Sequence, residues 1–233
     1  MITITLDAIH EMVKETQNSD FVTTSHFFEQ LYANQCMPLT QARSDSKKIL
    51  FLITGGIGAG KSTLAYKFVN YFELFELPFI STDLLYRVHF KNKSGFERDY
   101  NNARNMTDER LLILQTANCS FVWETVLSKE KKRCYIETLQ KHGYEVVCLF
   151  IMADPQVCIK RSNDRTNQGN HFVPADFILD RHHKTALSYE WMKKIADIMI
   201  LFDNSEQIRL VHYKSKDQAY TSSSIPEYLI DII

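Results

Sequence analysis

A cluster of glycines near residue 55 constrains the fold more than any other feature of this sequence. Four of the chain's seven glycines fall within six consecutive positions of the run Gly55-Gly56-Ile57-Gly58-Ala59-Gly60-Lys61-Ser62-Thr63. The run matches the phosphate-binding loop pattern G-x-x-x-x-G-K-[ST], in which glycine dihedrals let backbone N–H groups turn towards a polyphosphate. Lys61 would reach the β- and γ-phosphates, and the Ser62 hydroxyl would hold Mg²⁺. All nine residues are therefore expected to bind the phosphates of a nucleotide.

The residues on either side of this loop favour a strand before it and a helix after it. Residues 49–53 form a continuous apolar run, which is typical of a strand buried on both faces of a parallel sheet. Beyond the loop, apolar residues recur at helical spacing at Leu64, Ala65, Phe68, Val69 and Phe72. Such a helix points its positive N-terminal end at the bound anion. A glycine-rich turn with a chance lysine is the alternative, and this context disfavours it.

Length and composition place the chain among globular proteins. Its 233 residues are enough for a sizeable core, with 45% hydrophobic and 24% charged residues. A formal net charge of −1 argues against a protein that coats nucleic acid. Five scattered cysteines without a C-x-x-C pair indicate reduced thiols, and no stretch is long and apolar enough to span a membrane. We expect a cytoplasmic protein, although specialised export stays open.

Strands alternate with helices along the chain, which predicts an α/β fold with a parallel sheet of about five strands covered by helices. Three segments are expected: an N-terminal helical segment over 1–46, a nucleotide-binding domain over 47–213 and a C-terminal tail over 214–233. Further strands are expected at 77–81, 120–124, 144–152 and 197–203, with an edge strand at 208–213.

The helices are expected from apolar stripes and caps. Two stripes occur in the N-terminal segment, at Leu6, Ile9, Met12 and Val13, and at Phe27, Phe28, Leu31 and Tyr32. Residues 91–105 are expected to be loop with weak helix, and 108–116 helix. Ser128 is expected to cap a helix that ends before Gly143, and Asp154 to cap the next one. A loop or lid follows at 168–174, and then a helix over 175–194.

Two acids follow predicted strands and are candidates for chemistry. Asp83 comes after the second strand, where it could accept the proton of an attacking hydroxyl or simply cap the helix from Leu84 onward, and the sequence weighs these alternatives evenly. Glu124 ends the third strand, where it could hold Mg²⁺ or substrate. Function is favoured over an exposed cap at Glu124, because the strand ends of open α/β sheets collect ligand groups.

Two arginines four residues apart share one face of a predicted helix. Arg161 and Arg165 could neutralise a transferring phosphate, or could form an ordinary solvated basic face. Neither alternative is preferred on the residues alone. His171 by itself is more often structural than catalytic.

Taken together, these residues resemble the zeta toxin family, the phosphate-loop kinases of bacterial toxin–antitoxin systems. The resemblance covers residues 48–205 in four blocks, of which the first is Gly55 to Thr63 and the second is Ser81-Thr82-Asp83 with Arg87. The third block is Phe121-Val122-Trp123-Glu124-Thr125-Val126-Leu127-Ser128, which continues to Gly143-Tyr144-Glu145-Val146. The fourth block runs from Arg161-x-x-x-Arg165 to His171-x-Val173-Pro174 and is followed by Ile178, Arg181 and Asp203-Asn204-Ser205.

The resemblance implies an ATP-dependent kinase with a separate sugar-nucleotide pocket and an antitoxin partner. It implies that Lys61 binds ATP phosphates, that Asp83 activates the acceptor hydroxyl, and that Arg161 and Arg165 stabilise the transferring phosphate. Substrate contacts are expected from Arg87, Glu124, Thr125 and His171. Characterised relatives phosphorylate UDP-N-acetylglucosamine.

The function expected from the sequence is therefore transfer of the γ-phosphate of ATP, with Mg²⁺, to a hydroxyl of a nucleotide-sugar or related nucleotide. The alternatives are an ATP-binding interaction module, and an effector of the same fold that acts on another nucleotide such as a nicotinamide dinucleotide.

Overall fold

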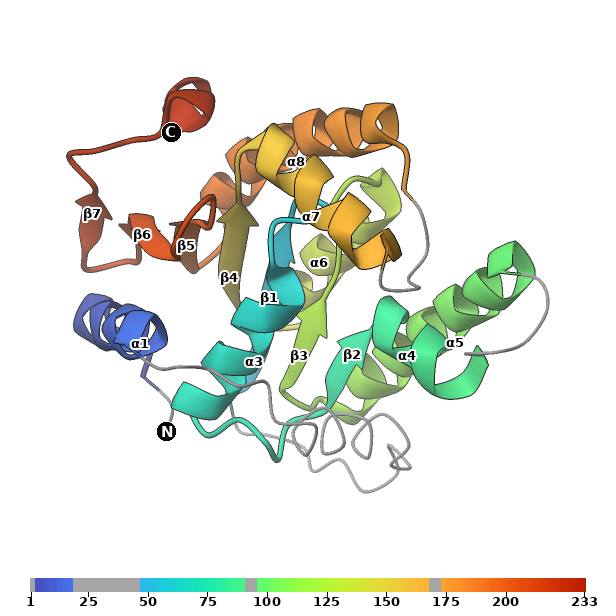
Figure 1. The fold of residues 1–233 in the computed structure, drawn as a ribbon. Helices are drawn as coiled ribbons and strands as arrows, with labels where there is room; N and C mark the ends of the chain where they lie inside the picture. Colours follow the sequence, from blue (N-terminus) through green and yellow to red (C-terminus); the bar gives the residue numbers. More distant parts are fainter. Residues whose placement is uncertain (1–2, 19–46, 91–95, 168–172) are drawn as a thin grey trace.

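A seven-stranded sheet runs through the centre of this computed structural model, which describes residues 3–18, 47–90, 96–167 and 173–233 (Figure 1). The strand order is β2-β3-β1-β4-β5-β6-β7. The first five strands in this order are parallel, and β6 and β7 continue the sheet in antiparallel fashion. The α/β fold with about five parallel strands is confirmed. The strands are β1 (Lys48–Gly55), β2 (Phe79–Ser81), β3 (Phe121–Glu124), β4 (Tyr144–Met152), β5 (Ile198–Asp203), β6 (Arg209–Lys214) and β7 (Ala219–Thr221).

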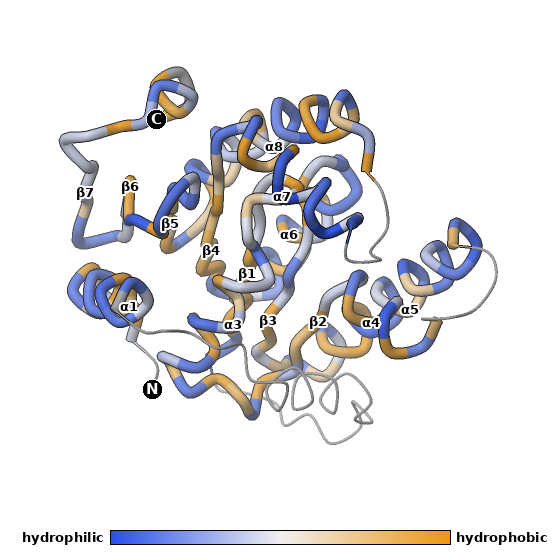
Figure 2. Tube along the Cα trace, viewed as in Figure 1, coloured by the Kyte–Doolittle hydropathy of each residue, from blue (hydrophilic) through white to orange (hydrophobic). Residues whose placement is uncertain are grey.

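Helices cover both faces of this sheet (Figure 1). They are α1 (Leu6–Asn18), α3 (Lys61–Tyr71), α4 (Thr82–Phe90), α5 (Phe96–Ala117), α6 (Glu130–Lys141), α7 (Pro155–Asn167), α8 (Ala175–Ile195) and the short 3₁₀ helix η2 (Glu227–Ile232). Alternate residues of β1 enter different cores. Phe51 and Ile53 pack with α1 and α3, whereas Leu50 and Leu52 pack with α5, α6 and α8. Figure 2 shows the hydrophobic residues gathered in the central strands, as a sheet buried on both faces requires.

The first N-terminal stripe forms α1 as predicted. Ile9, Met12 and Val13 are buried, and the helix lies against β6 and α3. The Gln17 side-chain amide also donates to the Ile208 carbonyl at 2.7 Å, which ties the end of α1 to the segment before β6. The second expected stripe, at 27–32, lies outside the described residues.

The expectation of a loop with weak helix over 91–105 was wrong from residue 96 onward, where α5 begins. The buried stripe of α5 starts with Asp99, Ala103 and Thr107 before it reaches Leu111 and Leu114. Small and polar residues carry the first half of the stripe, so a search for large apolar side chains misses it. Residues 91–95 lie outside the described residues.

Two further details differ from the prediction, at Ser128 and at residues 208–213, and a third, at Gly143, agrees with it. Ser128 does not cap α6, because its Oγ accepts a hydrogen bond from Arg181 at 3.1 Å and the helix begins only at Glu130. The strand at 208–213 was expected at the edge of the sheet, but β7 pairs with β6 on its outer side. Gly143 has a φ of 82° just beyond α6, as its predicted role in ending the helix requires.

Candidate active site

The glycine-rich loop connects β1 to α3 and is held tightly from two sides. Gly58 and Gly60 have φ values of 81° and 94°, in the left-handed region that favours glycine. A Cβ atom on Gly58 would lie 2.6 Å from the carbonyl oxygen of Cys158 in α7, and one on Gly60 would lie 2.3 Å from Asn204 Nδ2. The backbone therefore needs glycine at both positions, and the loop has the strand-before, helix-after setting of a phosphate cradle.

Lys61 begins α3 and points back over the loop, where its Nζ donates to the Gly56 carbonyl at 2.9 Å. Loss of hydration lowers the pKa of Lys61, and the nearby charges of Glu124 and Asp83 oppose that shift. A half-buried ammonium group held by a single loop carbonyl is well placed to accept phosphate oxygens as partners.

Ser62 and Glu124 meet directly beside the loop. The Ser62 hydroxyl donates to Glu124 Oε1 at 2.6 Å. The contact exists because β3 pairs with β1 in a register that sets Glu124 opposite Ile53. Burial raises the pKa of Glu124, and the hydrogen bond from Ser62 and the charge of Lys61 counteract the rise.

A hydroxyl and a carboxylate are oxygen ligands of the kind that Mg²⁺ prefers, so Ser62 and Glu124 fit the ion. The described part of the chain contains no group of three or more His, Cys, Asp or Glu side chains that could hold a metal. A magnesium ion here would thus take its other ligands from nucleotide phosphates and water.

Asp83 is the second residue of α4 and its carboxylate is exposed. The Leu84 N–H donates to Ser81 Oγ at 3.4 Å, so Ser81 occupies the capping role that was the alternative for Asp83. The charge of Asp83 raises the pKa of both Lys61 and Glu124. The three side chains therefore lie within electrostatic range of one another, at the carboxyl ends of β1, β2 and β3.

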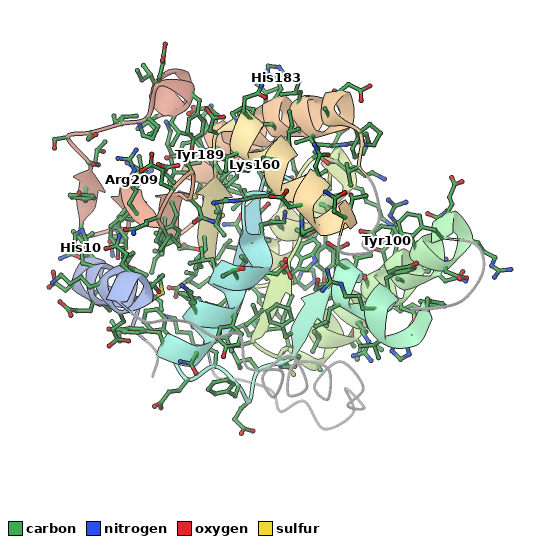
Figure 3. The ribbon with its side chains drawn as sticks, viewed as in Figure 1. His10, Tyr100, Lys160, His183, Tyr189 and Arg209 are labelled. Carbon is green, nitrogen blue, oxygen red and sulfur yellow. The ribbon has the colours of Figure 1, made fainter. Side chains whose placement is uncertain are left out.

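Tyr100 on α5 holds Asp83 in place, and the sequence analysis did not identify it. Its hydroxyl donates to Asp83 Oδ1, and burial together with the Asp83 charge raises the pKa of Tyr100. Its ring packs against Tyr86 and Phe96 at centroid distances of 5.6 and 5.4 Å. The guanidinium of Arg104 lies over the same ring at 4.7 Å. Figure 3 shows Tyr100 on α5, beside α4.

Arg161 holds the segment after β5, which contacts the phosphate loop. Its guanidinium donates to the carbonyls of Asn204 at 2.7 Å and Ser205 at 3.3 Å. The Asn204 side chain in turn donates to the Ala59 carbonyl at 2.8 Å. Arg161 thus links α7 to the phosphate loop through the segment that follows β5. Arg165 lies one turn further along, is exposed, and lowers the pKa of Lys61 by its charge.

The other expected substrate residues are spread more widely. Arg87 is exposed in the last turn of α4. Thr125 is buried, donates its N–H to the Ile53 carbonyl at 3.0 Å, and accepts a hydrogen bond from Lys132 Nζ. His171 lies outside the described residues. Lys132 was not singled out from the sequence, where it stands within a lysine-rich run on an amphipathic helix.

A cavity of about 220 Å³ adjoins the loop on the side away from Asp83's helix. Gly60 and Thr63 line it from the loop, Asn204 and Gln207 from the segment after β5, and Gln17 from α1. The N-terminal helix therefore forms part of the wall beside the phosphate loop, which the sequence analysis did not foresee.

Comparison with known proteins places this site in a family. The AAA domain family matches residues 50–189, which is more than half of the chain. The chain belongs to the AAA domain family. The match includes the whole phosphate loop and all of α4, α5 and α6. No curated protein sequence matches the chain.

Solved structures share the fold of this AAA domain protein at low sequence identity. A chain of the PezAT chromosomal toxin–antitoxin system of Streptococcus pneumoniae is 18% identical, with a TM-score of 0.62 over 85% of this chain and 84% of that one. A chain of the AvrRxo1-ORF1:-ORF2 complex with ATP is 14% identical, with a TM-score of 0.66 over 93% of this chain and 70% of that one. The resemblance to the zeta toxin family is confirmed at the level of the fold.

No helix in the described ranges is long and apolar enough to cross a membrane.

Proposed function

We propose that this protein is a kinase that transfers the γ-phosphate of ATP to a hydroxyl group of a nucleotide or nucleotide-sugar, of the UDP-N-acetylglucosamine type. One observation carries the proposal: the exposed carboxylate of Asp83 does not cap its helix, and Tyr100 holds it within electrostatic range of Lys61. A protein that only binds a nucleotide does not need an oriented carboxylate on the acceptor side of the loop.

The donor would be held by the loop and its cavity. Backbone N–H groups of residues 55–63 and the Lys61 ammonium would bind the phosphates, and the cavity lined by Gly60 and Thr63 offers room for the nucleoside. Magnesium, held through Ser62 and Glu124, would neutralise charge on the phosphates. The ATP in the AvrRxo1 structure, which shares this fold, supports ATP as the donor.

Asp83 would then act as the general base. As the acceptor oxygen attacks the γ-phosphorus, its O–H bond breaks and the proton passes to the Asp83 carboxylate. The bond from the γ-phosphorus to the β–γ bridging oxygen breaks in the same displacement, which leaves ADP and a phosphorylated acceptor. A positioned base contributes on the order of 10²–10⁴-fold to such a step. Arg165, exposed on α7, would neutralise the phosphate during transfer.

We further propose that an antitoxin protein restrains this activity. The PezAT chain, which shares this fold over 84% of its length, comes from a toxin–antitoxin system. A kinase that consumes a nucleotide-sugar of its own cell would need such a partner.

The direct test is ADP release from Mg²⁺-ATP with a panel of nucleotide-sugars and nicotinamide dinucleotides, comparing the native chain with Asp83→Asn. We expect acceptor-dependent release from the native chain. In Asp83→Asn the release should fall by roughly 10²–10⁴-fold, because the base is lost while the donor site is unchanged. Undiminished release by the variant would remove the assigned role of Asp83. ATP binding without release for any acceptor would favour an ATP-binding interaction module.

A further inference from the structure

The segment that follows β5 contacts the phosphate loop through Asn204. Asn204 Nδ2 donates to the Ala59 carbonyl at 2.8 Å, and a Cβ atom on Gly60 would lie 2.3 Å from the same Nδ2 atom. The carbonyl and the N–H of a trans peptide point in opposite directions, so this hydrogen bond turns the Gly60 N–H away from Asn204. Backbone N–H groups of such loops are the groups that bind phosphates. The position of Asn204 therefore sets the direction of one of these N–H groups.

The Asp203 carboxylate holds the turn that carries Asn204. Asp203 Oδ1 accepts hydrogen bonds from the N–H of Ser205 at 3.0 Å and from the hydroxyl of Ser205 at 2.7 Å. An aspartate that bonds to the backbone two residues on closes a tight turn around the residue between them, which here is Asn204. Asp203 Oδ2 accepts from Arg209 at 2.7 Å, so both carboxylate oxygens have partners. The orientation of this buried carboxylate thus fixes the backbone at Asn204.

Tyr228 in η2 joins the C-terminal segment to this turn. Its hydroxyl donates to Asp203 Oδ1 at 2.5 Å and lies 3.3 Å from Ser205 Oγ. The centroid of its ring lies 6.0 Å from that of His182, and His182 Cδ2 would be 3.7 Å from a Cβ atom on Gly56 in the phosphate loop. Tyr228 therefore reaches the surroundings of the phosphate loop by two routes, one through its hydroxyl and one through its ring.

The two sides of η2 are packed differently. On one side, Leu229 is fully buried in the core that also contains Tyr189 and Met192 of α8. On the other side, a cavity of about 1170 Å³ lies between η2, α7 and the segment after β5, and its lining includes Val157, Ser205, Gln207, Pro226, Glu227 and Tyr228. Side chains that line a cavity lack packing partners there, so the hydrogen bond of Tyr228 matters more for holding this side of η2.

We propose that Tyr228 is a positioning residue for the phosphate loop, which acts through the Asp203 turn and Asn204, so that the docking of η2 sets the affinity of the loop for ATP. The inference rests on the proposed donor site and adds a control of that site by the C-terminal segment. Tyr228 does not line the smaller cavity beside the loop as the described residues define it, so it acts on the nucleotide through other residues.

The test measures binding of a non-hydrolysable ATP analogue with Mg²⁺ to the full chain by calorimetry at neutral pH. Tyr228→Phe keeps the ring beside His182 and removes the hydroxyl that bonds to Asp203. We expect it to weaken binding of the analogue by roughly fivefold, a usual size for a residue that acts through a connected network. Asn204→Ala should weaken binding at least as much. Adding Tyr228→Phe to Asn204→Ala should change the affinity by less than roughly twofold further, because the route to the loop is already cut.

Tyr135→Phe is the matched control for a loss of stability alone. The Tyr135 hydroxyl donates to the Leu111 carbonyl at 2.6 Å, and the residue packs with α5 and α6 on the face of the sheet opposite α3. This variant should lose stability as Tyr228→Phe does, yet bind the analogue as the native chain does. With the acceptor found by the screen, Tyr228→Phe should raise the KM for ATP by roughly fivefold and leave kcat within roughly twofold.

The proposal is overturned if Tyr228→Phe binds the analogue as tightly as the native chain, or if Tyr135→Phe loses as much affinity as Tyr228→Phe. It is also overturned if the two losses multiply in the double variant, because Tyr228 would then not act through Asn204. A native chain that binds no analogue would overturn the donor site and this inference with it. A chain that binds the analogue but transfers no phosphate would overturn the proposed kinase function and leave the role of Tyr228 to be decided by the titrations.

Discussion

Among single residues, Tyr100 makes the most informative contact in the site. Its hydroxyl supplies the hydrogen bond that orients the Asp83 carboxylate, and its ring is clamped by Tyr86 and Phe96. We expect Tyr100→Phe to lower kcat by roughly tenfold, because a hydrogen bond to a charged group is lost while the ring packing remains. The KM for ATP should stay unchanged, which steady-state kinetics with varied ATP would show.

Tyr86→Phe is the matched control for this prediction, since Tyr86 belongs to the same aromatic cluster and no described contact joins its hydroxyl to Asp83. Equal losses of kcat in Tyr86→Phe and Tyr100→Phe would mean that the cluster acts only through packing. Tyr100 would then have no positioning role.

Whether a residue of the site could be predicted depends on how far along the sequence the residues that it contacts lie. The phosphate loop could be predicted because its glycines, Lys61 and Ser62 are contiguous. Asp83 and Glu124 could be predicted because each follows a strand. Tyr100 could not, because its contact with Asp83 depends on α5 lying next to α4 and β2, and nothing in its own neighbourhood distinguishes it from an ordinary helix residue.

At the scale of elements, the phosphate loop and α7 are fitted against each other at Gly58. The left-handed φ of Gly58 and the 2.6 Å approach of a Cβ to the Cys158 carbonyl leave no room for a side chain. We expect Gly58→Ala to lower the free energy of unfolding by about 2–4 kcal/mol, the sum of a backbone penalty and an overpacking penalty. Urea denaturation followed by circular dichroism would measure it.

Gly56→Ala provides the comparison within the same loop. The nearest atom to a Cβ on Gly56 is 3.7 Å away, at ordinary contact distance. The stability of this variant should stay within about 1 kcal/mol of the native chain. Equal destabilisation by the two substitutions would contradict the specific fit of Gly58 against α7.

Among the elements, those with large, regularly spaced apolar residues could be predicted from the sequence, and those with small buried residues could not. Strands β1 to β6 and α3 were predicted because their apolar residues are large and regularly spaced. The start of α5 was missed because Asp99, Ala103 and Thr107 form its buried stripe, and these residues are not large apolar side chains. The burial of a small residue depends on its neighbours in space.

On the scale of the whole molecule, the C-terminal segment is joined to the sheet through Asp203. Burial alone would raise the pKa of Asp203, but hydrogen bonds from Tyr228, Ser205 and Arg209 hold it below its usual value. Tyr228 in η2 donates to Asp203 Oδ1 at 2.5 Å, which connects the end of the chain to the end of β5. Residues 214–233 were expected to be a C-terminal tail, and they contain β7 and the fully buried Leu229.

This link predicts a stability difference that depends on pH. Tyr228→Phe should lower the free energy of unfolding by about 1–2 kcal/mol at neutral pH, because one of several donors to a charged group is lost. A carboxyl whose pKa is lowered by folding stabilises the fold only while it is ionised. The difference should therefore be complete above the ordinary value of 3.8 and shrink as the pH falls below it.

Thermal unfolding of the native chain and Tyr228→Phe between pH 3 and 7 would measure this difference. Tyr220→Phe in β7 is the control, since no described contact joins its hydroxyl to Asp203. A gap between native and Tyr228→Phe that is constant over this pH range would show that Tyr228 does not act through the Asp203 charge.

The central claim is that the γ-phosphate of ATP reaches an acceptor hydroxyl, and following that phosphate tests it most directly. ATP labelled at the γ-phosphate is incubated with the full chain, Mg²⁺ and the acceptor panel, and the label is recovered either on an acceptor or as inorganic phosphate. The account predicts that the label appears on a nucleotide or nucleotide-sugar acceptor, in an amount equal to the ADP formed. It also predicts that this labelled product is lost in Asp83→Asn. Label recovered only as inorganic phosphate, with or without an acceptor, would show a nucleotide hydrolase and contradict the account.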